Sequence, residues 1–169
     1  MPESSERITI LHGAGGTVMH DLIRNYVVKH LGGFSGRSVS DVTLEALDDA
    51  AVVGDIVLKS DSHAVKPIFF PGGDIGRLSV SGTVNDIAVL GAEPFALSCG
   101  LILEEGLSLS DFERILRSMR ETCMEAGVGI VTGDTKVVEK GVLGGCVINI
   151  SGVGKRTDAL ESNLQIVKS

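Results

Sequence analysis

Five aspartates at the ends or in the middle of short apolar runs are the residues of this sequence best suited to chemistry. They are Asp48, Asp49, Asp61, Asp86 and Asp134. Carboxylates placed in this way can converge on a divalent cation, and Mg²⁺ takes one or two carboxylates together with phosphate oxygens. Asp86 is the most informative, because an aspartate inside an apolar helix loses favourable solvation unless it is paired or coordinated. The spacing leaves two interpretations open, a shared Mg²⁺ site or separate turn and capping residues.

Two further segments could contact a phosphate group. The segment Gly133-Asp134-Thr135-Lys136 combines backbone amides with a carboxylate, a hydroxyl and an ammonium group, although it lacks the spacing of a Walker A loop. The glycine-rich segment His12-Gly13-Ala14-Gly15-Gly16 precedes a predicted helix and could bend over a nucleotide, offering its amides. The first segment could also be a plain strand-to-turn connection, and the second a mobile N-terminal loop.

Composition and charge exclude several classes of function. With 169 residues, of which 43% are hydrophobic and 22% charged, the chain suits one globular domain with a substantial core. The net charge of −7 argues against a nucleic-acid partner, because a phosphate backbone requires a basic surface. No apolar stretch approaches the ~20 residues of a membrane span, and the acidic N-terminus is unlike a signal peptide. Together with three widely spaced cysteines, these features predict a cytoplasmic protein with no membrane segment.

Hydrophobic periodicity predicts the elements that must position these residues. Helices are expected over residues 18–31, 74–91 and 110–126, with Ser110 and Glu113 as the capping pair of the last. Strands are expected over residues 8–11, 51–53, 56–58, 95–103, 128–131 and 142–153. The pattern favours an α+β fold in which helices pack on one mixed or antiparallel sheet. Residues 1–155 would form this domain, and residues 156–169 a linker or the start of another element.

Taken in order, the motifs resemble those of the HypE family of hydrogenase maturation proteins. That family lies within the superfamily of aminoimidazole ribonucleotide synthetase, selenophosphate synthetase and thiamine-monophosphate kinase. The segments NDIAVLGAEP (residues 85–94) and GDTK (residues 133–136) are shared across the superfamily. The segment VKPIFFPGGDIG (residues 65–76) is specific to the HypE family. The resemblance extends over residues 7–155 and therefore covers most of the chain.

The resemblance implies a fold and a set of ligands. The fold would be the N-terminal ATP-binding domain of the synthetase type, paired with a copy of itself through a sheet or barrel interface. ATP and Mg²⁺ would bind at the acidic loops. By motif, the metal ligands would be Asp49, Asp61, Asp86 and Asp134, with Asp48 as an alternative to Asp49. Phosphate contacts would come from Asn85, Gly133, Thr135 and Lys136, and the nucleotide would be covered by His12, Gly13, Gly15 and Gly16.

The resemblance also implies a reaction and partners. HypE-like proteins use ATP to dehydrate a carbamoylated C-terminal cysteine to a thiocyanate, the source of the cyanide ligands of nickel–iron hydrogenase. In that reaction the catalytic groups would be Lys136 and a metal ion held by Asp86, which would stabilise charge on the transferring phosphoryl group. The implied partners are the carbamoyltransferase HypF, the HypC–HypD complex and a second copy of the chain as a homodimer.

This chain departs from the HypE pattern at its C-terminus. The second domain and the terminal cysteine are absent, since the chain ends Ile166-Val167-Lys168-Ser169. We therefore expect the nucleotide-binding half of such an enzyme, inactive on its own. Two alternatives remain. One is a small-molecule kinase of the thiamine-monophosphate type, disfavoured by the sequence of residues 61–66. The other is a non-catalytic dimerisation module, disfavoured by the intact Asp61, Asp86, Asp134 and Lys136.

Overall fold

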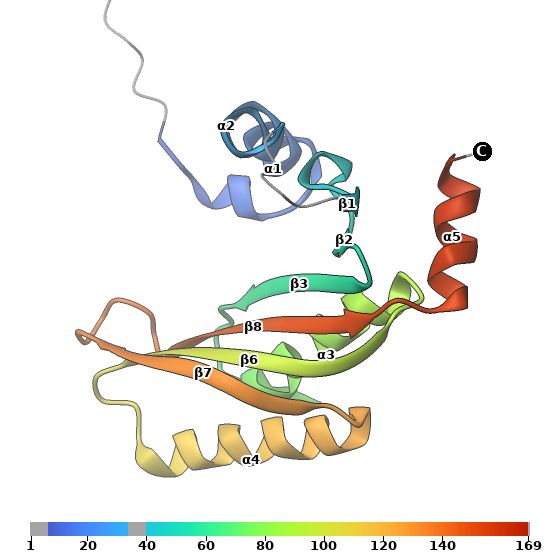
Figure 1. Cartoon of the computed structure of the whole chain (residues 1–169). Helices are drawn as coiled ribbons and strands as arrows, with labels where there is room; N and C mark the ends of the chain where they lie inside the picture. Colours follow the sequence, from blue (N-terminus) through green and yellow to red (C-terminus); the bar gives the residue numbers. More distant parts are fainter. Residues whose placement is uncertain (1–6, 34–39, 169) are drawn as a thin grey trace, which may run out of the picture.

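The computed structural model describes residues 7–33 and 40–168, and its centre is a six-stranded sheet (Figure 1). The strands lie in the order β1-β2-β3-β8-β6-β7. Neighbouring strands are antiparallel except β6 and β7, which are parallel. A separate two-stranded ribbon pairs β4 (Phe69–Phe70) with β5 (Gly73–Asp74). The strands of the main sheet are β1 (Ser40–Val42), β2 (Ala51–Val53), β3 (Ile56–His63), β6 (Glu93–Glu104), β7 (Gly129–Val138) and β8 (Cys146–Lys155).

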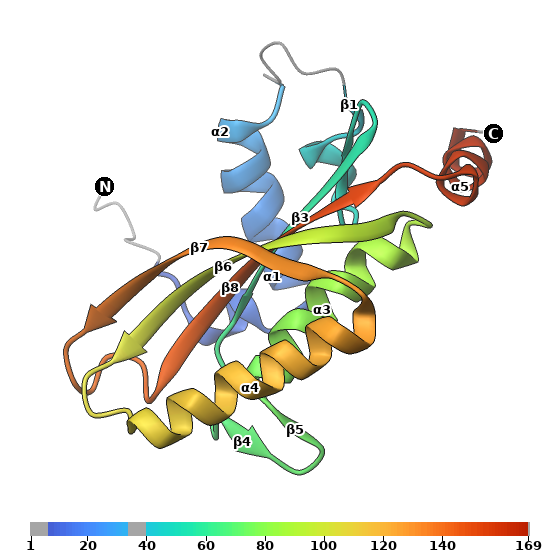
Figure 2. The same ribbon diagram turned by 60° about the horizontal axis from the view of Figure 1, so that its bottom comes forward.

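Two long helices, α3 (Ile75–Val89) and α4 (Leu109–Ala126), cover one face of the sheet (Figure 2). Helix α3 begins where the Asp74 carboxylate accepts hydrogen bonds from the amides of Gly76 and Arg77, 2.8 and 3.1 Å away. Helix α4 connects β6 to β7, because parallel neighbours need a crossover of this kind. In the described part of the chain no helix is both long and apolar enough to cross a membrane.

The main core lies between the sheet and these two helices. Along β8, Ile148 and Ile150 are fully buried against the helices, whereas Asn149 and Ser151 are partly exposed on the opposite face. This alternation fixes the register of the sheet, since a slip of one residue would expose the apolar set. The other members of this core include Ile75, Val80, Leu97, Ile115 and Met119.

A second, smaller core lies at the end of the sheet where α3 finishes. It joins α3 to the β2–β3 hairpin and to a third helix, α5 (Asp158–Lys168). Its members include Val52, Val57, Ile87, Leu90, Leu160 and Leu164. Helix α5 occupies the residues for which the sequence predicted a linker or another element, and the division of the chain at residue 155 stays a prediction. Residues 1–6 and 34–39 of the predicted domain lie outside the described residues.

The predicted α+β architecture is confirmed, with differences at the ends of elements. Helix α4 is capped by Ser108 rather than Ser110, and the Ser108 hydroxyl accepts a hydrogen bond from the Asp111 amide at 3.0 Å. Strand β7 is longer than predicted, so residues 133–136 lie inside a strand and not in a turn. Strand β8 begins at Cys146, four residues later than predicted, because Glu104 holds the preceding loop.

The N-terminal segment is helical and lies on the side of the sheet away from α4 (Figure 1). Its elements are η1 (Ile10–Gly13), α1 (Gly16–Leu22), η2 (Ile23–Val28) and α2 (Lys29–Leu31). The strand predicted over residues 8–11 is wrong, because these residues are exposed and η1 is a 3₁₀ helix. The helix predicted over residues 18–31 is present as α1, η2 and α2, but it buries none of its residues. Tyr26 and Leu31 are more than half exposed.

Glu104, the last residue of β6, holds the loop between β7 and β8. Its carboxylate accepts backbone hydrogen bonds from Gly141 at 3.0 Å and Leu143 at 2.6 Å, and a third from Gly144. These donors lower the pKa of Glu104 from 4.5 to about 2, because they stabilise the charged carboxylate. The ends of β6, β7 and β8 are thereby tied together by one side chain.

The hydrogen bonds that Glu104 accepts lead to a prediction about stability in acid. The pKa of Glu104 is lower in the folded chain than in the unfolded chain. Its contribution to the free energy of unfolding is therefore fully present above pH 4.5 and is lost as the pH falls towards 2. We expect Glu104→Gln to lower the urea midpoint at neutral pH and to flatten the loss of stability across that acidic window. Glu105→Gln, on the neighbouring exposed residue, is the control and should leave the profile unchanged. Equal profiles for both variants would contradict the proposed role of Glu104.

Candidate functional site

A row of polar side chains lies where β3 meets α3, and we call it the β3–α3 seam. It consists of Lys59, Asp61 and His63, at every second position of β3, and Gly82 and Asp86, one turn apart on α3. The Lys59 ammonium nitrogen lies 2.6 Å from Asp86 Oδ2. His63 Nε2 lies 3.4 Å from Asp61 Oδ2. Two of the five predicted aspartates therefore share one helix–strand contact.

Asp86 has the partner that its sequence position requires. The sequence predicts that a carboxylate within this apolar helix must be paired or coordinated, and the pairing group is Lys59. The two side chains are only 27% and 19% exposed, so water and salt screen this ion pair less than an ion pair on the open surface. Sequence reasoning missed Lys59, although its spacing of two from Asp61 and of four from His63 is that of one strand face.

His63 is held tightly by the helix opposite. Its side chain is 11% exposed, and its Nδ1 atom is buried without a hydrogen-bond partner among the described residues. A Cβ added to Gly82 would lie 2.9 Å from His63 Nε2 and 3.4 Å from Asp61 Oδ2. Glycine at position 82 thus lets α3 approach the two β3 side chains closely.

Asp48 and Asp49 lie in the loop after the short helix η3 (Leu44–Ala46) and are exposed. The Asp48 carboxylate accepts a hydrogen bond from the Asp49 amide at 2.8 Å, so this loop is partly ordered by its own side chain. Both aspartates line a cavity of 430 Å³ whose other walls include Lys59 and Ser60. Lys59 therefore connects this acidic loop to the seam, because it lines the cavity and pairs with Asp86.

Asp134 lies on the opposite face of the sheet from Asp61. Asp61 of β3 pairs with Ile150 of β8, which pairs with Cys99 of β6. Cys99 in turn pairs with Gly133 of β7, so all four residues lie on the helix-covered face. Asp134 follows Gly133 and so points the other way, as does Lys136, whose ammonium lies 3.9 Å from the Asp134 carboxylate. Both side chains are more than two-thirds exposed.

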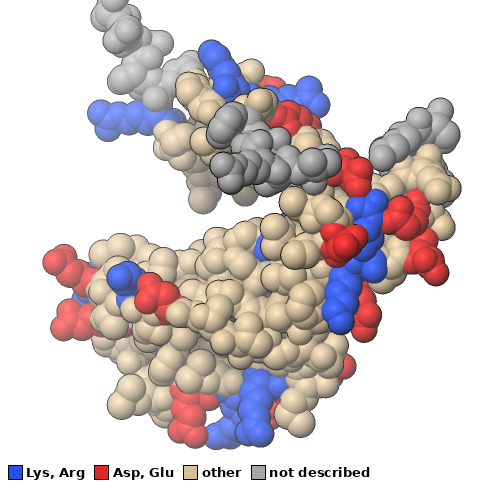
Figure 3. Space-filling model, viewed as in Figure 1, with Lys and Arg blue, Asp and Glu red and all other residues tan. Residues whose placement is uncertain are grey.

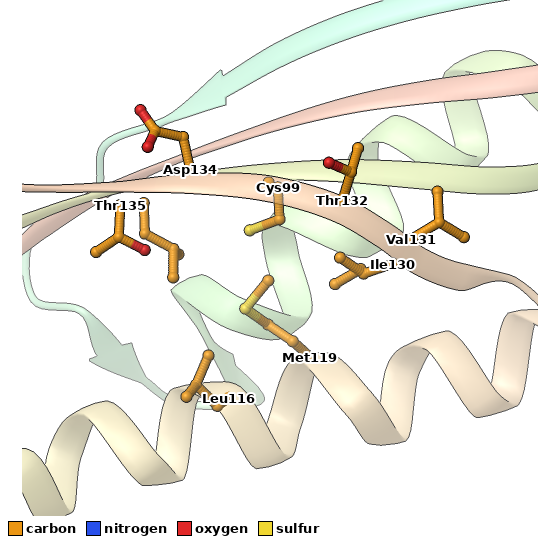
Figure 4. A pocket seen from close by; sticks show the side chains of 10 residues that line it. Cys99, Leu116, Met119, Ile130, Val131, Thr132, Asp134 and Thr135 are labelled. Atoms are coloured by element: carbon orange, nitrogen blue, oxygen red, sulfur yellow. The ribbon is translucent and has the colours of Figure 1, made fainter.

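A cavity of 590 Å³ lies between α4 and the strands β6 and β7 (Figure 4). Figure 4 shows Thr135 pointing towards α4 and Asp134 pointing away from it. The lining is mainly apolar, and burial raises the pKa of the Cys99 thiol to about 11, with a smaller contribution from nearby Cys123. Cys99, held as the neutral thiol beside Leu116 and Met119, acts as a packing residue. The phosphate role of residues 133–136, three of which line this cavity, stays a prediction.

The remaining predicted nucleotide contacts lie elsewhere. Asn85 is exposed on α3 beside Asp86. In the segment 12–16, His12 Nδ1 accepts a hydrogen bond from the Thr9 amide at 3.0 Å. Gly15 and Gly16 have φ angles of +81° and +71°, which favour glycine. Residues 133–136 run along residues 99–102 of β6 as part of the edge strand.

The predicted ligands thus fall into three groups: the seam with Asp61 and Asp86, the loop with Asp48 and Asp49, and the edge strand with Asp134. Over residues 7–33 and 40–168, no three His, Cys, Asp or Glu side chains are arranged so that they could hold a metal ion. The assignment of Asp49, Asp61, Asp86 and Asp134 to one metal site therefore stays a prediction. Figure 3 shows charged side chains gathered at the two ends of the sheet and along α4, with a mostly uncharged surface between them.

Comparison with known proteins places this geometry in a family. The family model "AIR synthase related protein, N-terminal domain" matches residues 47–155. A hydrogenase expression/formation protein of Methanocaldococcus jannaschii is 53% identical over 153 residues, which are 88% of this chain and 44% of that protein. The carbamoyl dehydratase HypE of Escherichia coli K12 is 42% identical over 151 residues, 87% of this chain and 44% of that protein. The chain thus spans less than half the length of these relatives.

Solved structures agree with this placement. A structure described as a HypE–HypF complex matches with a TM-score of 0.72 and 46% identity, over 81% of this chain and 43% of the matched chain. A HypE in complex with ATP matches with a TM-score of 0.60 and 45% identity, over 89% of this chain and 44% of the other. The thiamine monophosphate kinase of Aquifex aeolicus matches with a TM-score of 0.58 over 83% of this chain and 44% of the other, but at 17% identity it shows a shared fold only.

The close approach at Gly82 can be tested by adding one carbon atom. Alanine is favoured over glycine in a helix by about 1 kcal/mol, but the new Cβ would press on the buried His63 ring. We expect Gly82→Ala to lower the free energy of unfolding by about 1–2 kcal/mol in urea titrations. In a His63→Ala background the obstruction is gone, and the same substitution should become stabilising. Destabilisation in both backgrounds would mean that another contact is responsible.

Proposed function

Because the chain belongs to the AIR synthase related family, we propose that it is the nucleotide-binding half of a HypE-type carbamoyl dehydratase. The proposal rests on one observation above all: the relatives that carry this name are 42–47% identical over nearly the whole of this chain. The full enzyme would use ATP to dehydrate a carbamoylated C-terminal cysteine to a thiocyanate. This chain would contribute the ATP site, and the cysteine would have to come from another part of the protein.

The seam and the neighbouring loop suit Mg²⁺, because carboxylate oxygens are the ligands that it prefers. Asp86 is the first candidate, since a cationic group already lies against its carboxylate. We assign Asp61, two positions from Lys59 on the same strand face, and Asp49, in the cavity that Lys59 lines, to the same site. Asp48 is the alternative to Asp49. Bound Mg²⁺ would neutralise charge on the nucleotide phosphates.

The edge strand would supply the remaining contacts. Asp134 is the fourth proposed metal ligand, and Lys136 on the same face of β7 would bind phosphate. Gly133 and Thr135, whose side chain points towards α4, and Asn85 of α3 are assigned to phosphate contacts by their motifs. Since Asp134 and Lys136 face away from the seam, we propose that they serve a nucleotide shared with a second copy of the chain. Lys136 would then stabilise charge on the transferring phosphoryl group, as a fixed ammonium group can. Residues 12–16 would cover the nucleotide.

Partners follow from the same assignment. We propose that HypF is a partner, because the solved relative described as a HypE–HypF complex includes a chain that matches most of this one. The HypC–HypD complex and a cytoplasmic location are part of the same proposal. The small-molecule kinase alternative has only a shared fold in its favour. The non-catalytic alternative is disfavoured by the intact Asp61, Asp86, Asp134 and Lys136.

The metal assignment is tested by removing Asp86. We expect Asp86→Ala to abolish Mg²⁺-dependent ATP binding, because the carboxylate would anchor the cation between the protein and the phosphates. Calorimetric titration of ATP with and without Mg²⁺ measures this directly. The exposed Asp158→Ala on α5 removes the same charge and should bind ATP as the unaltered chain does. Unchanged affinity in Asp86→Ala would rule out this metal site.

The homodimer is tested at the edge strand. β7 is a long strand at the edge of the sheet and exposes apolar side chains, which is typical of a strand that pairs with another chain. We expect a dimer mass by light scattering at tens of micromolar, and we expect Val131→Lys to weaken the dimer about tenfold or more. Val131 and Met124 are both 71% exposed, so Met124→Lys on α4 is the matched control. A monomer for the unaltered chain would contradict the proposal.

A further inference from the structure

We propose that Lys59 competes with the metal ion at Asp86. In this proposal the Lys59 ammonium group occupies the position where a divalent cation would contact the Asp86 carboxylate, and it must move before the cation can bind. Lys59 would therefore set the metal concentration at which the site fills. The inference rests on the metal–nucleotide function proposed above and adds a residue that the family motifs do not assign.

The position of the Lys59 ammonium group supports this competition. The ammonium nitrogen lies 2.6 Å from Asp86 Oδ2. A Mg²⁺ ion bound to the same carboxylate would lie about 2.1 Å from one of its oxygens. The two cationic centres would then be only a few ångströms apart. Because the two side chains are 19% and 27% exposed, counter-ions would do little to screen the repulsion between them.

Lys59 has a place to go when the metal arrives. It lines the 430 Å³ cavity together with Asp48, Asp49 and Ser60, so its flexible stem can turn the ammonium group away from the seam and into this space. There it would meet other carboxylates or the phosphates of a bound nucleotide. Binding would thus exchange the single positive charge of Lys59 for the two positive charges of the metal ion at Asp86. The seam would gain one positive charge, whereas it would gain two if the Asp86 carboxylate had no lysine partner beforehand.

Removing the ammonium group should therefore tighten metal binding. The probe is Mn²⁺ without nucleotide, measured by the loss of the free-ion electron paramagnetic resonance signal. We expect Lys59→Met, which keeps an unbranched side chain, to bind Mn²⁺ about fivefold more tightly than the unaltered chain, the scale of one partly exposed ion pair. Lys59→Gln should do the same, and Lys59→Arg, which keeps the charge, should change the affinity less than twofold.

Two controls separate competition from a general effect of net charge. Lys155→Met removes the same charge from β8, where the ammonium lies 5.2 Å from the centre of the Phe95 ring, and it should leave Mn²⁺ affinity unchanged. Asp86→Asn should abolish the gain, so that Lys59→Met/Asp86→Asn binds no more tightly than Asp86→Asn alone. Circular dichroism melting of each variant confirms that the chains compared are folded.

The proposal is overturned if Lys59→Met and Lys59→Gln bind Mn²⁺ no more tightly than the unaltered chain, or if none of the three binds it at all. It is also overturned if the gain persists in the Asp86→Asn background, because the effect would then not pass through Asp86. Failure of the proposed function looks different. In that case the unaltered chain binds no ATP with Mg²⁺ in the calorimeter, whereas the Lys59 variants still gain Mn²⁺ affinity through Asp86.

Discussion

Helix α3 lies against the sheet at a distance that only glycine permits, and the rest of the structure depends on this contact. A Cβ at Gly152 would lie 2.6 Å from Ile87 Cδ1, and one at Gly154 would lie 2.5 Å from Ile87 Cγ2. With no side chain at these two positions of β8, Ile87 sits directly on the strand backbone and is fully buried. The helix is thereby close enough for the Asp86 carboxylate, one residue earlier, to reach Lys59 on the neighbouring strand.

The sequence predicts that α3 packs on the sheet and that Asp86 needs a partner, but it does not identify that partner. Small residues along α3 indicate close packing on a sheet, and the desolvation argument requires a partner for Asp86, which the structure supplies. The partner was missed because the apolar run that predicts this strand ends at Leu58, one residue before Lys59. The polar continuation of the strand is paired along its length with β8, and that pairing is a tertiary effect which local propensity does not contain.

The same limit explains the other differences. Residues 133–136 have the composition of a turn, yet they form a strand because β6 pairs with them in parallel over the whole segment. A Cβ at Gly133 would lie 2.1 Å from the Cys99 carbonyl oxygen, so the glycine that suggests a turn is required by this pairing. The predicted metal ligands stay a prediction, and the structure places them in three separate groups. Their division between two faces of one sheet depends on strand register, which spacing along the chain does not reveal.

Register has a further consequence in β7. Leu97 of β6 pairs with Ile130, but the next residue, Ser98, pairs with Thr132, so Val131 is an extra residue in a β-bulge. Counting alternate positions forward from Ile130 would place Asp134 on the helix-covered face, and the bulge reverses that count. The strand is therefore divided into an apolar half and a polar half whose orientations are independent. One residue can be lost or gained at the bulge without turning the carboxylate or the ammonium group of the polar half to the other side.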